Sequence, residues 1–182
     1  MGKQAAPGRL DLIREFVNTY DLEDDTDRIG TPEELRTWLK DAGLLGGRAS
    51  VADEDVRNAA TVRGAIRDLL LAHTGRALEA EAPRTLDAAA RRARLGVRFH
   101  PDGGAAVESE AKGVDGAIGE LLSIIAASMA DGSWERLKAC QADDCHWAFY
   151  DHTRNHSGVW CDMAVCGNRA KVERFRARQR AD

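Results

Sequence analysis

The hexapeptides Cys-Gln-Ala-Asp-Asp-Cys (residues 140–145) and Cys-Asp-Met-Ala-Val-Cys (residues 161–166) contain all four cysteines of this 182-residue sequence. Two pairs of equal spacing, separated by a short insert, are typical of a tetrahedral metal site, because each pair closes one loop around the ion. Four thiolates favour Zn²⁺, which accepts soft ligands and is satisfied by four of them. The sequence therefore predicts one structural Zn²⁺, bound by Cys140, Cys145, Cys161 and Cys166.

Two disulfides are the alternative use of four cysteines, and they are typical of small secreted proteins. The first residues contain no apolar signal segment, and the sequence contains no run of about 18 apolar residues that would span a membrane. We therefore expect a cytoplasmic protein without a membrane partner. The reducing conditions of that compartment favour metal binding over disulfide formation.

A strongly basic segment follows the last cysteine. Residues 163–181 carry six basic side chains and one acidic side chain, Glu173, although the whole chain has a net charge of −4. In a predicted helix over residues 167–180, Val172 and Phe175 form a narrow apolar stripe, and basic side chains cover most of the remaining surface. Outward guanidinium groups suit phosphate contact. A solvated helix in an arginine-rich chain is the simpler interpretation of the same segment.

The fold class that we predict is mainly α with a small β-hairpin (α+β). Residues 8–132 form a helical domain, with helices near 10–20, 32–42, 53–74 and 114–130, and another after Pro83. Thr31, Pro32 and Glu34 predict a capped helix start with a capping box. Residues 97–110 predict a hairpin, the only strand signal before the cysteines. Residues 131–133 separate this domain from the segment 134–182.

Residues 134–182 predict a treble-clef or ribbon-like zinc finger. A strand at 146–151, a turn and a return strand at 159–161 form the expected hairpin, and the basic helix follows it. The metal substitutes for a core that so short a segment could not build alone. Three histidines, His146, His152 and His156, could replace a cysteine. We expect them to lie outside the ligand set, because four thiolates complete the shell.

Three aromatic side chains of the finger, Trp147, Phe149 and Trp160, present more apolar area than one zinc site covers. We expect the finger to dock on the N-terminal domain through them, since large exposed apolar patches are uncommon. If the finger is flexibly tethered instead, a second copy of the chain provides the cover, and the protein is a homodimer.

Within the N-terminal domain, Asn18 and Trp38 are weak candidates for ligand binding. Each also has an ordinary explanation, as a satisfied polar group and as a core side chain. The sequence contains no glycine-rich phosphate loop, no Ser-His-Asp set and no carboxylate pair that stands out. We therefore do not expect an enzyme.

The finger resembles the CGNR zinc finger family in three motifs: Trp-Cys-Asp-Met-Ala-Val-Cys-Gly-Asn-Arg-Ala-Lys at 160–171, Cys-x4-Cys-His-Trp-x-Phe at 140–149 and Asp-x-x-Arg-Asn at 151–155. Phe-Val-Asn-Thr at 16–19 and Trp-Leu at 38–39 are similar to the domain that precedes this finger, described as a putative stress-induced transcription regulator. The resemblance implies four cysteine ligands to zinc and DNA binding in bacteria. Family members commonly carry two arginines where this chain has Gly158 and Val159, which implies fewer phosphate contacts and a weaker dependence of affinity on salt.

We therefore expect a zinc-binding transcription regulator of a stress response, whose N-terminal domain senses a small molecule or a protein. The expected contacts with DNA are Arg154, Asn168, Arg169, Lys171, Arg174 and Arg178. The alternative is a protein-interaction zinc module with a small-molecule-binding N-terminal domain and no affinity for DNA. That alternative predicts that Arg174 and Arg178 are buried in ion pairs with the acidic N-terminal part of the chain.

Overall fold

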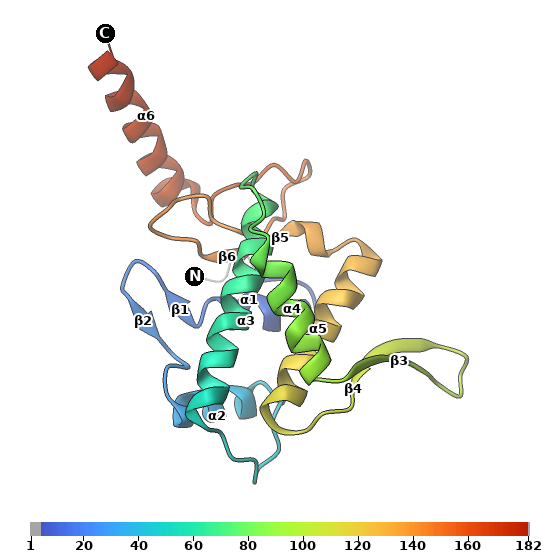
Figure 1. The fold of residues 1–182 in the computed structure, drawn as a ribbon. Helices are drawn as coiled ribbons and strands as arrows, with labels where there is room; N and C mark the ends of the chain where they lie inside the picture. The colour runs from blue at the N-terminus through green and yellow to red at the C-terminus, as the bar shows by residue number, and fades with distance from the viewer. Residues whose placement is uncertain (1–4, 182) are drawn as a thin grey trace.

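A computed structural model describes residues 5–181 of the chain (Figure 1). Its α-helices are α1 (Leu10–Val17), α2 (Pro32–Asp41), α3 (Asp53–Ala72), α4 (Glu81–Arg92), α5 (Gly113–Asp131) and α6 (Asn168–Ala181). Three antiparallel strand pairs complete the fold: β1 (Tyr20–Asp21) with β2 (Thr26–Asp27), β3 (Leu95–Phe99) with β4 (Ala105–Ser109), and β5 (Leu137–Ala139) with β6 (Ala148–Tyr150). The expected α+β class, with a helical N-terminal part and a C-terminal cysteine cluster, is confirmed.

The core lies among α1, α3 and α5, with α4 packed on α3 and α5. Phe16 and Ile13 of α1, Ile66 of α3 and Leu121 of α5 are fully buried there. By length and composition, α5 could cross a membrane, but half of its most apolar window is buried inside this structure. It therefore packs here as the central core helix. Met129, near the end of α5, is 51% exposed.

Local sequence signals set several helix ends as expected. Thr31 accepts a hydrogen bond from the backbone N–H of Glu34, and the Glu34 carboxylate accepts one from the backbone N–H of Thr31. This reciprocal pair is the predicted capping box, and it satisfies two N–H groups that the first turn of a helix leaves free. At the other end of the domain, Gly132 adopts a left-handed conformation (φ 78°) and ends α5.

The pair β1–β2 was not predicted, because Tyr20 was assigned to the first helix. The helix ends at Val17, and long-range hydrogen bonds from α3 hold the following segment. Arg63 donates to both carboxylate oxygens of Asp27 at 2.6 and 2.7 Å. Arg67 donates to the backbone carbonyls of Val17 and Tyr20 at 2.7 and 2.8 Å. These buried guanidinium groups fix a turn that carries no apolar periodicity of its own.

The C-terminal segment docks on the N-terminal domain, although not through the predicted aromatic residues. Asn18 donates to the carbonyl of Ala148 at 2.9 Å and accepts from the N–H of Ala148 at 2.7 Å, so it pairs with β6 as another strand would. Ala148 and Tyr150 belong to the same core cluster as α1 and α3, together with Leu137 of β5. Neighbouring residues of a strand face opposite sides, so Phe149 points away from that core.

Candidate metal centre and basic helix

Four cysteine sulfurs converge at the junction between the strand pair β5–β6 and α6. The Sγ atoms of Cys140, Cys145, Cys161 and Cys166 all lie within 4.8 Å of one another. The Sγ atom of Cys161 is 3.6 Å from that of Cys145 and 3.7 Å from that of Cys166. A tetrahedral Zn²⁺ site with Zn–S bonds of about 2.3 Å has S···S edges of about 3.8 Å. The sulfurs therefore have the spacing that a zinc ion requires.

The first cysteine pair is positioned by a continuation of the β5–β6 ladder. The N–H of Cys140 donates to the carbonyl of Trp147 at 2.9 Å, and the N–H of Cys145 closes a turn on Ala142 at 3.0 Å. The strand that pairs with β6 therefore precedes Cys140. This corrects the predicted hairpin between residues 146–151 and 159–161. The carbonyl of Val159 accepts from the N–H of Gln141 (2.9 Å), and residues 159–161 form no strand with the described residues.

The second pair is positioned by a π-helix over Met163–Gly167, which leads directly into α6. Asp162 caps it by accepting from the N–H groups of Ala164 and Val165 at 2.7 and 3.3 Å. A Cβ atom at Gly167 would lie 2.4 Å from the sulfur of Met163. Glycine therefore leaves room for the Met163 side chain beside the turn that carries Cys166.

Crowding of the sulfurs shifts their pKa values in opposite directions. Hydrogen bonds from Cys145 and Cys161 lower the pKa of the Cys140 thiol to about 2, and the backbone N–H of Cys161 acts in the same direction. The bond to Cys140 raises the pKa of Cys145 to about 12, and burial raises the pKa of Cys166. Without a metal, hydrogen bonds from neighbouring thiols stabilise one thiolate, and those neighbours must keep their protons to donate the bonds. A divalent cation stabilises all four thiolates together.

A buried ion pair supports the loop between the two cysteine pairs. Lys138 of β5 donates to the Asp151 carboxylate at 2.8 Å and to the carbonyls of His156 and Gly158 at 2.6 and 3.1 Å. Asp151 also accepts from the N–H groups of Thr153 and Gly158. Burial opposes ionisation of Asp151, but the bonds from Lys138 and Thr153 outweigh it and hold the pKa of Asp151 well below its usual range. A Cβ atom at Gly158 would lie 3.0 Å from this carboxylate, so the glycine belongs to the same arrangement.

Two of the six residues predicted to contact DNA, Asn168 and Arg169, are engaged at the base of α6, and Arg174 Nε donates to the carbonyl of Ala170 within the helix at 3.2 Å. The Asn168 side chain donates to the carbonyl of Ala164 at 3.0 Å. Arg169 donates to the carboxylates of Asp144 and Glu23, the latter at 3.4 Å. Arg169 thus joins the first cysteine loop to the turn between β1 and β2. The structure gives both residues a positioning role, and their predicted contact with DNA stays a prediction.

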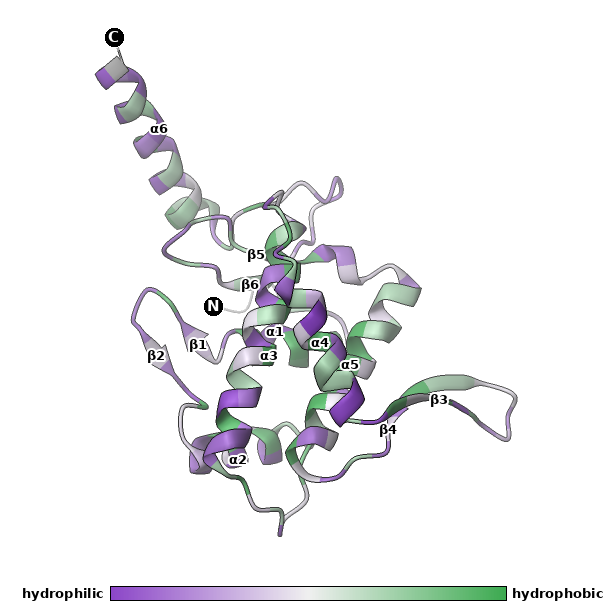
Figure 2. Cartoon of the chain, in the orientation of Figure 1, coloured by the Kyte–Doolittle hydropathy of each residue, from purple (hydrophilic) through white to green (hydrophobic). Residues whose placement is uncertain are grey.

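The other four predicted residues, Arg154, Lys171, Arg174 and Arg178, are exposed. In the described range 5–181, none of them forms an ion pair. Helix α6 extends away from the rest of the molecule and mixes hydrophilic with hydrophobic residues along its length (Figures 1 and 2). The alternative function predicted that Arg174 and Arg178 are buried in ion pairs, and this arrangement is not observed in the described part of the chain.

The three histidines lie outside the ligand set, as expected. The group of residues that could hold a metal consists of the four cysteines alone in the described structure. His152 Nε2 lies 3.0 Å from the carbonyl of Ala5, and the carbonyl of His156 accepts from Lys138. His146 follows Cys145 with a φ of 50°, and burial lowers its pKa.

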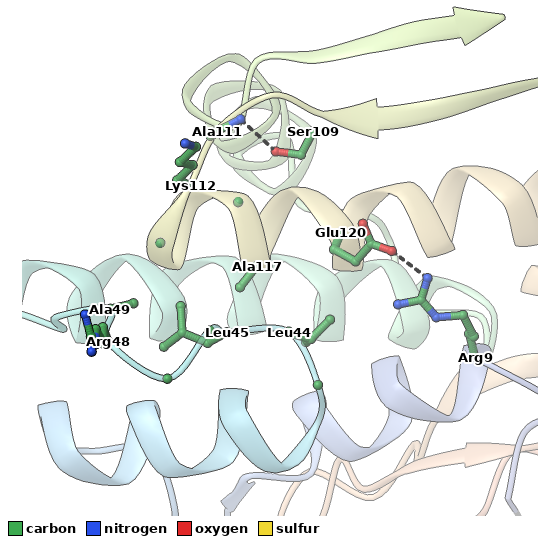
Figure 3. A pocket seen from close by; sticks show the side chains of 15 residues that line it. Arg9, Leu44, Leu45, Arg48, Ala49, Ser109, Ala111, Lys112, Ala117 and Glu120 are labelled. Atoms are coloured by element: carbon green, nitrogen blue, oxygen red, sulfur yellow. Dashed lines mark hydrogen bonds and ion pairs between the residues drawn. The ribbon is translucent and has the colours of Figure 1, made fainter. Parts of the chain in front are cut away.

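The two weak ligand candidates of the N-terminal domain are both engaged in the packing of the fold. Asn18 pairs with β6, and the Trp38 ring packs 5.4 Å from the ring of Phe16. An open pocket of about 730 Å³ lies elsewhere, between the loop after α2 and the start of α5 (Figure 3). Arg48 and Lys112 contribute cationic side chains to its lining, while Arg9 bonds Glu120 at 2.5 Å along one side.

Sequence reasoning missed the residues that act through distant partners: Lys138, Glu23 and Asp144. Lys138 is the middle residue of a three-residue strand, between Leu137 and Ala139, and nothing in its spacing links it to Asp151. Glu23 and Asp144 are separated from Arg169 by 146 and 25 residues. Only the tertiary structure brings these charges together.

Comparison with protein families agrees with this architecture. The model of the CGNR zinc finger matches residues 136–179, and the ABATE model, described as a putative stress-induced transcription regulator, matches residues 10–132. No curated protein matches the sequence. The finger match and the spacing of the four sulfurs together identify Zn²⁺ as the metal of this site.

Proposed function

The chain belongs to the ABATE family of putative stress-induced transcription regulators, and we propose that it contacts DNA through α6 while its N-terminal domain responds to a cytoplasmic small molecule or protein. The zinc site supports this role by fixing where α6 begins. Cys166 is a ligand two residues before the start of the helix, so the metal, the π-helix and α6 form one connected unit. No catalytic step is part of the proposal.

The exposure of the basic side chains on α6 carries the proposal. Residues 171–180 are exposed throughout, and Lys171, Arg174, Arg176, Arg178 and Arg180 point into solvent from a helix that stands clear of the body (Figure 1). In the same segment Glu173 is the only acidic residue. Guanidinium groups fanned around a free helix suit phosphate contact and entry into a groove.

Hydrogen bonds within the protein reduce the number of side chains that can contact DNA in the proposed interface. Asn168 and Arg169 hold the base of α6 against the finger, so the contacts with DNA fall mainly on Lys171, Arg174 and Arg178, with Arg154 as a contact from the loop. The free guanidinium groups contribute mostly sequence-independent affinity, because they reach phosphates before base edges.

The pocket of Figure 3 is the candidate effector site of the N-terminal domain. Its volume of about 730 Å³ lies within the range of small-molecule sites. Leu44 and Leu45 supply apolar walls, and Arg48 and Lys112 supply positive charge. This lining favours a small anionic effector with an apolar portion.

The test is binding of the zinc-loaded protein to random and genomic duplexes over a series of salt concentrations. Changing Arg174→Gln and Arg178→Gln together should reduce the slope of log K against log salt by about two, since each phosphate contact contributes about 0.9. The matched control changes two exposed arginines of the N-terminal domain, Arg57→Gln and Arg91→Gln. It removes the same charge and should leave the slope unchanged. If both pairs of substitutions lower the slope equally, α6 contributes no more than its share of the net charge. Absence of any binding at low salt would refute DNA contact.

A further inference from the structure

Two hollows on the surface of the finger share the side chain of Trp160 as a wall. The first hollow, of about 310 Å³, lies between the first cysteine loop and α6, and Ala142 and Arg174 line it together with Trp160. The second hollow, of about 320 Å³, lies along β6 and the loop after it, and its lining includes Phe149 and Tyr150. Trp160 therefore borders two small cavities at once.

The ring of Trp160 is available to a ligand. The finger docks on the N-terminal domain through Leu137, Ala148 and Tyr150, and Trp160 is not a member of that core cluster within residues 5–181. Its side chain is half-buried, so its neighbours hold it while part of it stays accessible. Aromatic rings stack on one another with offset faces. An indole that borders two cavities therefore favours a ligand with flat aromatic rings.

The lining charges of the first hollow are largely balanced inside the protein. Asp143 pairs with Arg76, and Arg169 pairs with Asp144. Glu173 also lines the hollow, and it forms no ion pair among the described residues. A carboxylate accepts hydrogen bonds from the amino group of a nucleobase such as cytosine. The hollow therefore suits an uncharged aromatic ring with polar edges.

Positive charge that is free for a ligand lies beside each hollow. At the first, Arg174 Nε donates to the carbonyl of Ala170 at 3.2 Å, which leaves the terminal nitrogens of its guanidinium for another partner. At the second, Arg154 is exposed and directly follows Thr153, a lining residue. Guanidinium groups bind phosphate through pairs of parallel hydrogen bonds. A ligand in which phosphates join flat aromatic rings therefore matches the hollows and their surroundings.

We propose that the finger binds single-stranded nucleic acid, with unstacked bases in the two hollows beside Trp160 and phosphates on Arg154 and Arg174. The inference rests on the proposed function, because α6 again supplies phosphate contacts, and it names a strand with unpaired bases as the partner. In a duplex the bases stack on one another, so their faces cannot reach an indole at the wall of a cavity. In a single strand the faces are free, and aromatic side chains beside a cationic surface bind them without reading sequence.

The test is binding of the zinc-loaded full chain to oligothymidylate, oligouridylate and a duplex, each of about 12 nucleotides per strand. Trp160→Leu should weaken binding of the single strands about 10-fold or more, because it removes the ring on which the bases stack, and should leave duplex binding unchanged. Trp147→Leu is the matched control, since Trp147 is also half-buried and lines neither hollow. It should bind the single strands as the wild type does.

Tryptophan fluorescence gives a second measurement that does not depend on a loss of affinity. A base stacked on an indole quenches its emission, so the single strands should quench the wild type. Trp160→Phe keeps an aromatic ring, and it should keep most of the affinity while it loses the quenching. Trp147→Phe should keep both.

Each result decides the inference. Binding of the duplex without binding of either single strand overturns it and leaves the proposed function in place, whereas absence of all binding overturns both. Equal losses for duplex and single strand in Trp160→Leu overturn it too, because the tryptophan then acts through the fold of the finger. Zinc content and circular dichroism check that fold. If Trp160→Leu loses its zinc, the two phenylalanine variants decide: quenching that survives Trp160→Phe overturns the inference. The strand that binds more tightly, DNA or RNA, identifies the source of the ligand.

Discussion

The buried ion pair between Lys138 and Asp151 offers a sharp test of how the finger is held together. Their side chains are 4% and 1% exposed, and Asp151 is the one carboxylate that pairs with Lys138 among residues 5–181. Changing Asp151→Asn leaves the ammonium group buried with two carbonyl partners, those of His156 and Gly158. Removing one member of a buried ion pair costs about 3–5 kcal/mol, because the remaining charge is uncompensated.

That cost corresponds to a fall in the melting temperature of about 10 °C, since 1 kcal/mol shifts a chain of this size by about 2–4 °C. The assay is thermal unfolding with saturating zinc and reduced cysteines, so that metal loss and oxidation do not add to the change. Glu81→Gln is the matched control. It breaks an exposed pair with Arg84 (74% and 77% exposed), for which a cost below about 1 kcal/mol is expected.

The pH dependence follows from the lowered pKa of Asp151. A carboxyl with a lower pKa in the folded state stabilises the protein fully above its unfolded value of about 4, and this contribution is lost as the pH falls through the folded pKa. The cost of Asp151→Asn should therefore be constant between about pH 6 and pH 8. A cost below about 1 kcal/mol, or one that changes steadily across that interval, would refute the reasoning.

Three further outcomes are expected. Cys166→Ala should abolish stoichiometric zinc binding, and elemental analysis should find well under half an equivalent of zinc in the purified variant. Asn18→Ala should lower the unfolding free energy by about 2–4 kcal/mol in denaturant titration, because it leaves the N–H and the carbonyl of Ala148 buried and unpaired. A loss under about 0.5 kcal/mol would contradict the docking of the finger through Asn18. Gly119→Ala should cost about 1–3 kcal/mol, since its Cβ would lie 2.7 Å from Ser109, whereas Gly64→Ala has open space and should stabilise α3 by up to about 1 kcal/mol; equal effects would contradict the packing of α5 on β4.

Features with a local physical cause were predictable from the sequence. The spacing of the four cysteines is itself the geometric requirement of a tetrahedral site, so the ligand set followed from it, and so did zinc. The capping box at Thr31 lies within four residues, and the hairpin β3–β4 is set by alternation and a turn. The helix of residues 168–181 likewise follows from its own composition.

Contacts between distant segments were decided only by the tertiary structure. The partner of β6 is β5, not the residues after the turn, because Leu137 and Ala148 enter the shared core and Lys138 meets Asp151. Periodicity shows that a residue is apolar or polar, and it does not show which buried group it will satisfy. The same limit explains Asn18, whose amide replaces a strand neighbour of β6 across 130 residues of sequence.

The basic helix shows both parts of this division within one segment. Its charge and its helical form are properties of the sequence alone. The sequence alone does not determine which arginines can contact a partner. Arg169 forms ion pairs with Asp144 and Glu23, whereas Arg174 and Arg178 are exposed to solvent. An ion pair forms where the folded chain places opposite charges within reach, and that placement depends on how the finger docks against α1 and α3.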